Sequence, residues 1–463
     1  MSSEGNYPDY GREAGEHTPK IRLAGSVLSR QHHIASIAQK YADKPITTLA
    51  HHLDLLWMYE AFARVRKDSA PGIDGMLWAE YAENLESNLA DLLERVKGGR
   101  YKAPPVKRKL IPKNEKEFRA IGIPTLEDKI LQRAIAMILG PLYESMFLDC
   151  SFGFRPDRSA HQALDAVRET IVEINGGWVL DADIKAFFDT IPHQALMEIL
   201  RKRINDSVIL QLIGKWLKAG AMNGSAFLLA TEEGTPQGGV ISPLLSNIYL
   251  HEVLDGWFME TVKPCLKGRA RLIRFADDFV IVFEHLDDAG RVMNVLPKRF
   301  GKYGLQIHPE KTRLVDFMHP WQSGRKPGTF DFLGFTFYWG KTQKSGYAVK
   351  KKSAAKKIRR SLKQIHVWCK KHCHMPIAWL CKKLNEKLNG HYAYYGVTGN
   401  YKSIAEFRCR VERLLRYWLN RRSRQGDGMS WRRFGILMKD HFTLAAARIV
   451  HHAQTEHQLS WNI

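Results

Sequence analysis

The chain has 463 residues, 44% of them hydrophobic, which is enough for two or three domains with sizeable buried cores. Lys and Arg number 70 against 48 Asp and Glu, so the net charge of +22 favours a polyanionic partner such as nucleic acid. The sequence shows no apolar run of the roughly 18 residues that span a membrane, no signal peptide and no disulfide framework among its six scattered cysteines, which favours a cytoplasmic protein.

The first hundred residues predict helices that lead into an extended basic stretch. Residues 1–20 are rich in Gly, Glu and Ser without apolar periodicity, which is typical of a disordered segment. Apolar residues recur at helical spacing over 21–66, and APGIDG at 70–75 then predicts a loop. A further helix is predicted over 78–97. The following YKAPPVKRKLIPK is basic around a Pro-Pro pair, so a strand or loop along a phosphate backbone is expected.

The remaining pattern changes from mixed to helical. Between residues 177 and 335, short apolar runs alternate with helical segments, which indicates an α+β domain around a small sheet. After about residue 348 the pattern becomes long, basic and helical, interrupted by a Gly- and Tyr-rich loop at 389–401. A separate all-α domain is therefore predicted.

Three aspartates stand out in the mixed region. Asp277 and Asp278 interrupt an apolar run that otherwise predicts a buried β-hairpin. Burying two like charges is costly, so a bare pair more often marks a solvated turn. A third acid, Asp183, follows another apolar strand and precedes Phe187 and Phe188. Carboxylates from two distant strands can hold the two Mg²⁺ ions, about 3.5 to 4 Å apart, that in-line phosphoryl transfer uses.

These segments resemble motifs of reverse transcriptases. The FADD sequence ending at Asp278 resembles the YADD-type box, with Phe in place of the commoner Tyr. DADIKAFFD resembles the family's first acidic motif, in which the metal-binding Asp lies five residues before an aromatic that blocks the ribose 2′-hydroxyl. The resemblance implies that Asp183, Asp277 and Asp278 are the catalytic metal ligands and that Phe188 is the sugar gate.

Further blocks resemble the same family in the same order, over about residues 54–442. LIPKNEKEFRAIGIP implies that Lys113 and Arg119 bind the incoming triphosphate. EGTPQGGVISPLL implies that Gln237 contacts the nucleotide, and GLQIHPEKT that Lys311 protonates the leaving pyrophosphate. SFGFRPDRS and FDFLGF imply template, RNA or primer contacts by Arg155, Arg158, Phe332 and Gly334. Taken singly, the cations also fit solvated surface charges, and the aromatics fit a core strand pair.

The segments before and after the central motifs indicate which kind of reverse transcriptase the chain resembles. They are needed because viral, retron and defence enzymes share the central motifs. SAPGIDGMLWAEYAENLESNL resembles the N-terminal extension of group II intron enzymes. NGHYAYYGVTGNYKSIAEF resembles their maturase domain, which serves as the thumb and implies RNA contacts by Tyr394, Tyr395 and Arg413. A helical bundle with core aromatics and a solvated basic face explains each of these three residues singly. Many relatives continue into an HNH endonuclease with paired Cys-x-x-Cys motifs, and none is expected here.

The predicted fold is an α+β right-hand polymerase, with fingers and palm, followed by an all-α thumb or maturase domain. Residues 1–50 are expected to be partly disordered and then helical. Fingers and palm are expected at 51–345, including an N-terminal extension at 51–105. The thumb is expected at 346–425 and a short tail suited to DNA binding at 426–463.

The predicted function is that of an RNA-directed DNA polymerase that copies an intron RNA into cDNA and binds group II intron RNA to assist splicing and mobility. Its expected cofactor is Mg²⁺, as two ions, with Mn²⁺ as a substitute. Expected partners are intron RNA, an RNA template with a DNA primer, target DNA and dNTPs, with no membrane; the oligomeric state is open, a dimer included. Two alternatives stay open: a splicing maturase with weak or no polymerase activity, and a free-standing defence or CRISPR-associated reverse transcriptase.

Overall fold

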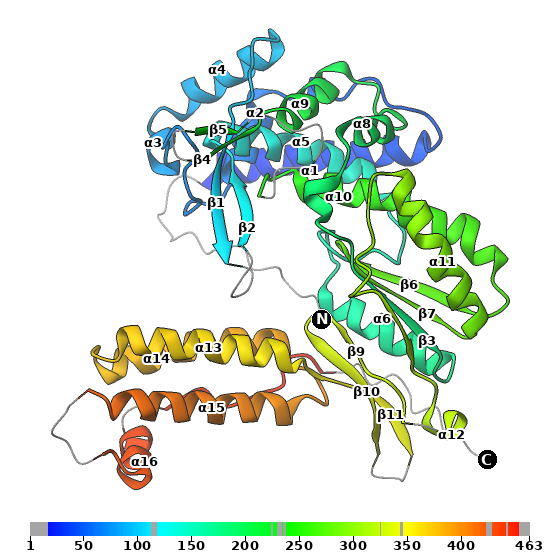
Figure 1. The fold of residues 1–463 in the computed structure, drawn as a ribbon. Helices are drawn as coiled ribbons and strands as arrows, with labels where there is room; N and C mark the ends of the chain where they lie inside the picture. Colours follow the sequence, from blue (N-terminus) through cyan, green and yellow to red (C-terminus); the bar gives the residue numbers. More distant parts are fainter. Residues whose placement is uncertain are drawn as a thin grey trace. The chain divides into compact units, whose positions relative to one another are not determined.

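The computed structural model describes residues 17–112, 118–223, 226–228, 234, 238–324, 326–342, 346–422, 428–440 and 443–452, and Figure 1 traces their course. The chain divides into two compact units. The first unit comprises Met1–Ala163, Ala182–Phe279 and Gly290–Thr312. The second comprises Leu164–Asp181, Val280–Ala289 and Arg313–Ile463.

The first unit begins with helices. They are α1 (His17–Lys40), α2 (Leu55–Ala63), α3 (Trp78–Glu83) and α4 (Leu85–Lys97). The helical spacing over 21–66 thus belongs to two helices, because α1 ends before a 3-10 turn and Asp54 starts α2 by accepting from the Trp57 amide at 2.8 Å. The helix predicted over 78–97 is interrupted at Asn84, whose ψ of 43° is not helical.

The basic stretch after α4 contains a strand, one of the two conformations, strand or loop, that the sequence predicts. β1 (Val106–Pro112) pairs antiparallel with β2 (Phe118–Ile123), and all side chains of β1 after Val106 are exposed. The edge of β1 pairs in parallel with β4 (Ala221–Asn223), which pairs with β5 (Ala226–Leu228), so the strand order is β2-β1-β4-β5.

Helix α5 (Leu126–Glu144) is the buried centre of the first unit, and one of its buried side chains is acidic. Asp128 is 1% exposed and accepts a hydrogen bond from the Tyr101 hydroxyl, to which Trp216 Nε1 donates at 2.9 Å. Burial raises the pKa of Asp128 to about 7. The helices α8 (His193–Arg201), α9 (Ser207–Leu217) and α10 (Ser242–Leu250) complete this region.

The raised pKa of Asp128 predicts a pH-dependent stability. The folded chain holds the proton of Asp128 more tightly than the unfolded chain. Protonated Asp128 therefore makes its full contribution to the free energy of unfolding below the unfolded pKa of about 4. It is lost as the pH rises to about 7, where the folded state also ionises. Asp128→Asn keeps an acceptor for Tyr101 and removes the titration. Urea unfolding at pH 5 and pH 7.5 measures the free energy of unfolding. Between these two pH values it should fall less for the variant than for the wild type, and equal decreases would contradict the prediction.

A second sheet carries the candidate acids. Its strands are β6 (Ala270–Phe275), β7 (Asp278–Phe283), β3 (Trp178–Ala182) and β8 (Arg313–Asp316), in the order β6-β7-β3-β8. β3 and β8 are antiparallel, and β7 is buried after its first residue. A near-continuous apolar run is expected of a strand that is covered on both faces. Helices α6 (Ala160–Glu173) and α11 (Leu286–Lys302) flank these strands in the chain.

The second unit contains a small antiparallel sheet followed by helices. The strands are β9 (Phe330–Phe332), β10 (Phe335–Lys341) and β11 (Tyr347–Ser353), in the order β11-β10-β9. The helical pattern that the sequence places from about residue 348 is wrong at its start, because Val349, Lys351 and Ser353 alternate with more exposed residues as in a strand. The first helix begins only at Ala355.

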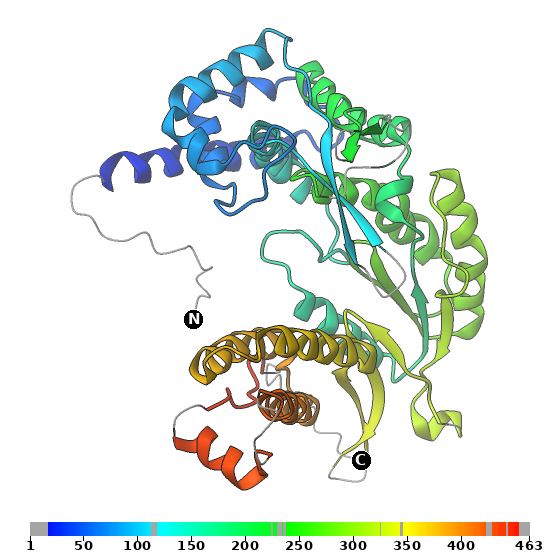
Figure 2. The ribbon, with the colours of Figure 1, turned by 60° about the vertical axis from the view of Figure 1, so that its left-hand side comes forward.

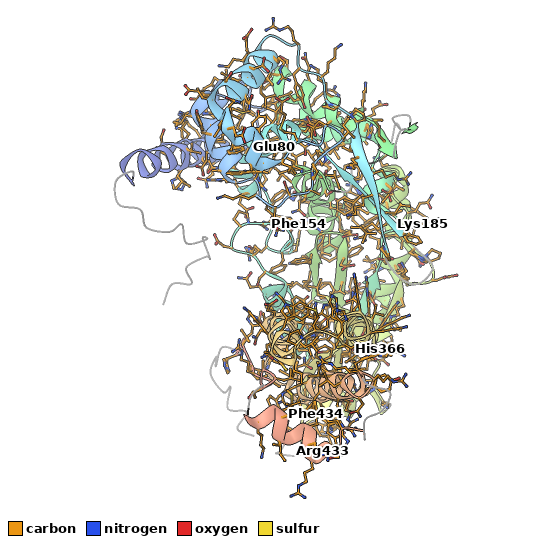
Figure 3. All side chains as sticks on the ribbon, turned by 90° about the vertical axis from the view of Figure 1, so that its left-hand side faces the viewer. Glu80, Phe154, Lys185, His366, Arg433 and Phe434 are labelled. Atoms are coloured by element: carbon orange, nitrogen blue, oxygen red, sulfur yellow. The ribbon has the colours of Figure 1, made fainter. Side chains whose placement is uncertain are left out.

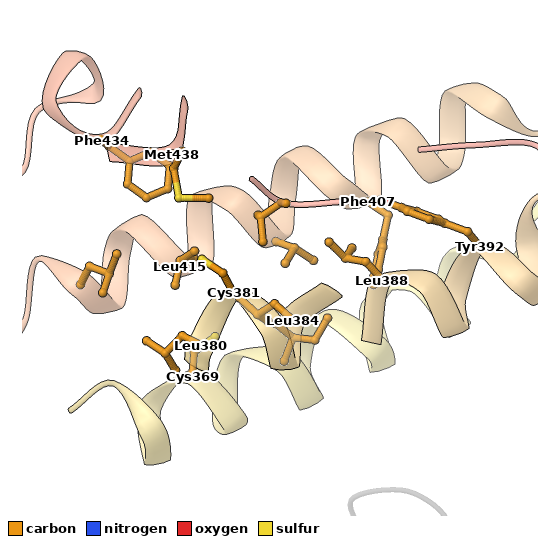
Figure 4. Packing of buried hydrophobic residues seen from close by; sticks show 14 of the residues in the cluster. Cys369, Leu380, Cys381, Leu384, Leu388, Tyr392, Phe407, Leu415, Phe434 and Met438 are labelled. Atoms are coloured by element: carbon orange, nitrogen blue, oxygen red, sulfur yellow. The ribbon is translucent and has the colours of Figure 1, made fainter. Parts of the chain in front are cut away.

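The C-terminal helices share one apolar core. They are α13 (Ala355–His372), α14 (Ile377–Tyr395), α15 (Tyr401–Leu419) and α16 (Trp431–Asp440). In both ribbon views α13, α14 and α15 lie side by side (Figures 1 and 2). Figure 4 shows the core between them, which includes Leu384, Leu388, Tyr392, Phe407 and Leu415.

The observed architecture confirms the predicted class, an α+β region followed by a helical one. Among the residues that the structure describes, no helix has both the length and the apolar character needed to cross a bilayer.

Candidate active site

The turn between β6 and β7 carries the paired aspartates. Ala276, at its start, has a φ of +57°, which lies in the left-handed region that favours glycine. Asp277 is half-buried and Asp278 is exposed. A loop packs directly on this turn, because a Cβ at Gly153 would overlap the backbone nitrogen of Ala276 and lie 2.9 Å from the Phe275 carbonyl carbon. Phe154, labelled in Figure 3, follows in the same loop.

The electrostatics of Asp277 show which charges lie near it. Burial raises the pKa of Asp277, the positive charge of Arg119 lowers it, and the negative charge of Asp183 raises it. Two of the three acids singled out from the sequence are therefore neighbours within the first unit, together with one of the cations expected to bind phosphate.

Asp183 lies directly after β3 and is paired with a lysine. Its carbonyl oxygen accepts from the His308 amide at 2.8 Å, which aligns the segment leading to Lys311. Lys311 Nζ donates to Asp183 Oδ2 at 2.7 Å, and both side chains remain partly exposed. The sequence thus selects two residues, 128 positions apart, that form an ion pair.

Phe188 lies on a short helix, α7 (Phe187–Thr190), which follows this acid in the chain. The preceding Ala186 has a φ of +48°, so the chain turns sharply after Asp183. Phe187 is buried and meets Phe188 edge to face, with ring centroids 5.3 Å apart. Phe187 therefore anchors the helix, while Phe188 stays half-buried. Lys185, labelled in Figure 3, is exposed between β3 and α7.

Of the other residues expected to contact the nucleotide, only Arg119 lies within the described part of the chain. Arg119 is exposed on β2, where β1 and β2 form the antiparallel hairpin. Lys113 and Gln237 lie outside the described residues.

The two arginines of the SFGFRPDRS block are engaged within the first unit. Arg155 is only 5% exposed, pairs with Glu144 at 2.7 Å and donates to the carbonyl oxygens of Leu148 and Ser151. The guanidinium of Arg155 thus holds the loop, and its expected RNA contact stays a prediction. Arg158 pairs with Asp149 at 2.5 Å and keeps some exposure.

In the second unit, the residues expected at the primer and RNA pack on one another. Phe332 is buried and Gly334 has a φ of +80° in the turn between β9 and β10. The Tyr394 hydroxyl donates to the Leu333 carbonyl at 2.8 Å, and the Tyr395 ring lies 5.1 Å from that of Phe335. Both tyrosines therefore hold the hairpin against α14, as a core role predicts.

Arg413, by contrast, lines a surface groove of about 460 Å³ on α13 and α15. Leu362, Leu414 and Tyr417 supply its apolar part. Its polar residues are Lys363, His366, Arg410 and Arg413. His366 is labelled in Figure 3. Arg410 pairs with Glu406, whereas among the described residues no carboxylate pairs with Arg413. The groove thus combines apolar surface with positive charge, which suits an unpaired base and its phosphate.

Sequence reasoning missed one functional candidate, Arg274. It lies on β6 with 0% of its side chain exposed and forms a two-oxygen ion pair with Asp255, which is equally buried. The signal was available: Arg274 lies inside the apolar run LIRFA, and an arginine there has to find a partner when the strand is buried.

The donors at the site fit a divalent metal in kind. Asp183, Asp277 and Asp278 offer the hard oxygen ligands that divalent cations prefer. Burial and, to a smaller extent, the charge of Asp183 raise the pKa of Asp277, and a bound cation would favour its ionised form. In this structure, however, Asp183 is paired with Lys311, and no three His, Cys, Asp or Glu side chains among the described residues are grouped closely enough to hold an ion.

The chain has an α+β region whose sheet carries acids at the ends of neighbouring strands, and a basic helical domain follows this region. This is the arrangement of a reverse transcriptase. Residues 111–337 match the family model described as reverse transcriptase (RNA-dependent DNA polymerase). Residues 356–435 match the model described as the maturase-specific domain of group II introns. The chain belongs to the group II intron reverse transcriptase and maturase family, as the sequence predicts.

The chain is also similar to named proteins. Protein YkfC of Escherichia coli (strain K12) is 37% identical over 260 residues, which cover 49% of this chain and 67% of YkfC. Group II intron-encoded protein LtrA of Lactococcus lactis subsp. cremoris is 38% identical over 225 residues, which cover 48% of this chain and only 37% of LtrA. A solved structure of telomerase from Candida albicans aligns over 76% of this chain and 66% of that one, with a TM-score of 0.43 and 15% identity.

Proposed function

We propose that the protein is an RNA-directed DNA polymerase that extends a DNA primer on an RNA template. The observation that carries the proposal is the proximity of Asp183, Arg119 and Asp277, because a cation-binding pair of acids beside an exposed arginine suits a metal-bound triphosphate. Asp278 begins β7 directly after Asp277 and is the third acid proposed as a metal ligand.

In the proposed mechanism the protein mainly binds and orients the reactants. Asp183, Asp277 and Asp278 would hold two Mg²⁺ ions, or Mn²⁺ in their place, which supply activation of the primer hydroxyl and neutralisation of the leaving group. Arg119 and Lys113 bind the triphosphate of the dNTP, and Gln237 contacts the nucleotide. The half-buried ring of Phe188 excludes a ribose 2′-hydroxyl. Lys311 Nζ leaves Asp183 and donates a proton to the departing pyrophosphate.

Primer extension tests this activity. The wild-type chain, given an RNA template, a DNA primer, dNTPs and Mg²⁺, should produce cDNA. The absence of any product would contradict the polymerase and favour a splicing maturase without synthesis.

We also propose that the protein binds group II intron RNA through its C-terminal helices to assist splicing and mobility at a target DNA. Helix α13 carries seven Lys and Arg residues and no Asp or Glu, so its field attracts phosphates. The groove on α13 and α15 supports the contact, since it offers the apolar surface of Leu414 and Tyr417 next to the exposed Arg413. Co-purification of one intron RNA from native cells tests this part, and an unrelated small RNA would favour a defence-linked enzyme.

Arg413→Ala should weaken binding of single-stranded RNA several-fold. The arginine has no carboxylate partner among the described residues, so its charge is available to a phosphate. The affinity falls as the salt concentration rises, and each lost phosphate contact makes the slope of log affinity against log salt shallower by about one. Fluorescence anisotropy with a labelled RNA oligonucleotide at several salt concentrations measures both quantities.

Lys402→Ala is the matched control, because Lys402 is also an exposed cation on α15 and does not line the groove. If both variants weaken binding equally, the effect belongs to overall charge rather than to the groove. Neither substitution removes a residue proposed to bind nucleotide, so primer extension at saturating template should continue.

The remaining assignments belong to the same proposal. Fingers and palm occupy residues 51–345, the thumb 346–425 and the tail 426–463. All six cysteines are free, which supports a reducing, cytoplasmic location.

A further inference from the structure

The turn that carries Asp277 and Asp278 is held by the buried Arg274. An arginine has five N–H donors, and here each one has an acceptor. Nε and Nη2 donate to the two Asp255 carboxylate oxygens at 2.7 and 2.5 Å, Nη2 donates also to Ser151 Oγ at 2.7 Å, and Nη1 donates to Asn247 Oδ1 at 2.9 Å and to the Ala276 carbonyl oxygen at 3.0 Å.

The bond to Ala276 matters because of the conformation of that residue. With a φ of +57°, Ala276 adopts a backbone geometry that residues with a Cβ rarely take. The surroundings must therefore maintain it. The Arg274 guanidinium fixes the Ala276 carbonyl, and the peptide plane that contains this carbonyl continues into the nitrogen of Asp277.

Both the backbone and the guanidinium of Arg274 connect this turn to the loop packed on it. Arg274 N donates to the Cys150 carbonyl at 2.7 Å, and the Phe152 amide donates to the Arg274 carbonyl at 2.8 Å. Asn247, which accepts from Arg274, donates through Nδ2 to the Gly153 carbonyl at 2.6 Å. Loop and turn are thus both fixed to Arg274, and a shift of its guanidinium would disturb both.

We infer that Arg274 is a positioning residue, which sets the orientation of the Asp277–Asp278 turn and thereby its affinity for divalent cations. This inference rests on the proposed polymerase function. The competing explanation is a buried ion pair with Asp255 that only stabilises the fold. A lysine separates the two, because it keeps the charge and lacks the planar fork that reaches Asp255 and Ala276 together.

The test compares full-length Arg274→Lys with Ser151→Ala. The control removes one acceptor from the same guanidinium and leaves the bond to Ala276 intact. Hydrogen–deuterium exchange of the segment 274–280, without metal, should become faster in Arg274→Lys and stay unchanged in Ser151→Ala. Mn²⁺ titration followed by electron paramagnetic resonance should show at least about threefold weaker binding for Arg274→Lys alone. Equal changes in both variants, or none in either, would overturn the inference.

A double variant keeps the test decisive if Arg274→Lys does not fold. Arg274→Met combined with Asp255→Leu removes both buried charges together, which leaves no uncompensated charge and preserves the fold in comparable cases. The bond to Ala276 is still lost, so fast exchange and weak Mn²⁺ binding are expected. Cation affinity equal to wild type in the folded double variant would refute the positioning role.

Failure of the proposed function would be recognised separately. A wild-type chain that synthesises no cDNA contradicts the polymerase, whereas the metal-free exchange result still decides whether Arg274 fixes the turn. A wild-type chain that is active, with an unaltered Arg274→Lys variant, contradicts only the positioning role.

Discussion

Asp277→Asn should lower the rate of cDNA synthesis by about a thousandfold or more, equivalent to about 4 kcal/mol of transition-state stabilisation. The asparagine has the same shape and cannot supply the negative oxygen that a catalytic cation requires. The free energy of unfolding of Asp277→Asn, in contrast, should rise. Burial and the charge of Asp183 both raise the pKa of Asp277, so the ionised carboxylate is disfavoured in the fold and its removal is expected to stabilise the chain.

Single-turnover primer extension and urea unfolding measure these two effects. Asp287→Asn is the matched control, because Asp287 is an exposed acid at the start of α11 that takes no part in the site. RNA binding by Asp277→Asn should match the wild type, which excludes a loss of fold. Synthesis within a few-fold of wild type would show that Asp277 holds no catalytic metal.

The sequence singles out the candidate acids because their pattern is local. An Asp pair inside an apolar strand run and an Asp before an aromatic pair are visible in short segments, and the structure brings Asp183 close to Asp277. The change from α+β to helical organisation was predictable for the same reason, since it rests on period and composition. The strand β11 was not, because its lysines resemble a basic helix until the alternation of burial is known.

The partners of the supporting residues could not be predicted from local pattern. Arg155 reads as a surface cation in sequence, and only the tertiary contacts with Glu144 and two carbonyl groups show that it is buried. The pair of Lys311 with Asp183 joins residues 128 positions apart, and that of Arg274 with Asp255 depends on how two segments pack. Motifs therefore indicate the candidate catalytic groups, while the buried contacts around them are visible only in the fold.

Gly153→Ala should reduce cDNA synthesis by about a hundredfold through the geometry of the aspartate turn. The new Cβ would overlap the backbone nitrogen of Ala276 and lie 3.1 Å from its Cα, and backbone atoms cannot rotate away as a flexible side chain does. The turn or the loop must shift, and a misplacement of about 1 Å at a catalytic group costs roughly a hundredfold in rate. Because Asn247 ties the Gly153 carbonyl to the Arg274 network, the displacement should reach Asp277 rather than be absorbed by the loop.

Gly140→Ala provides the matched control for this substitution. Gly140 lies in α5, and a Cβ there would meet nothing within 4 Å, so alanine should stabilise the helix by about 1 kcal/mol and leave synthesis unchanged. Steady-state kinetics should show the loss in Gly153→Ala in kcat with little change in KM for dNTP, because Arg119 lies on β2 and is not displaced. A rate equal to that of Gly140→Ala would mean that the loop yields without moving the turn, and that Asp277 is positioned independently of Gly153.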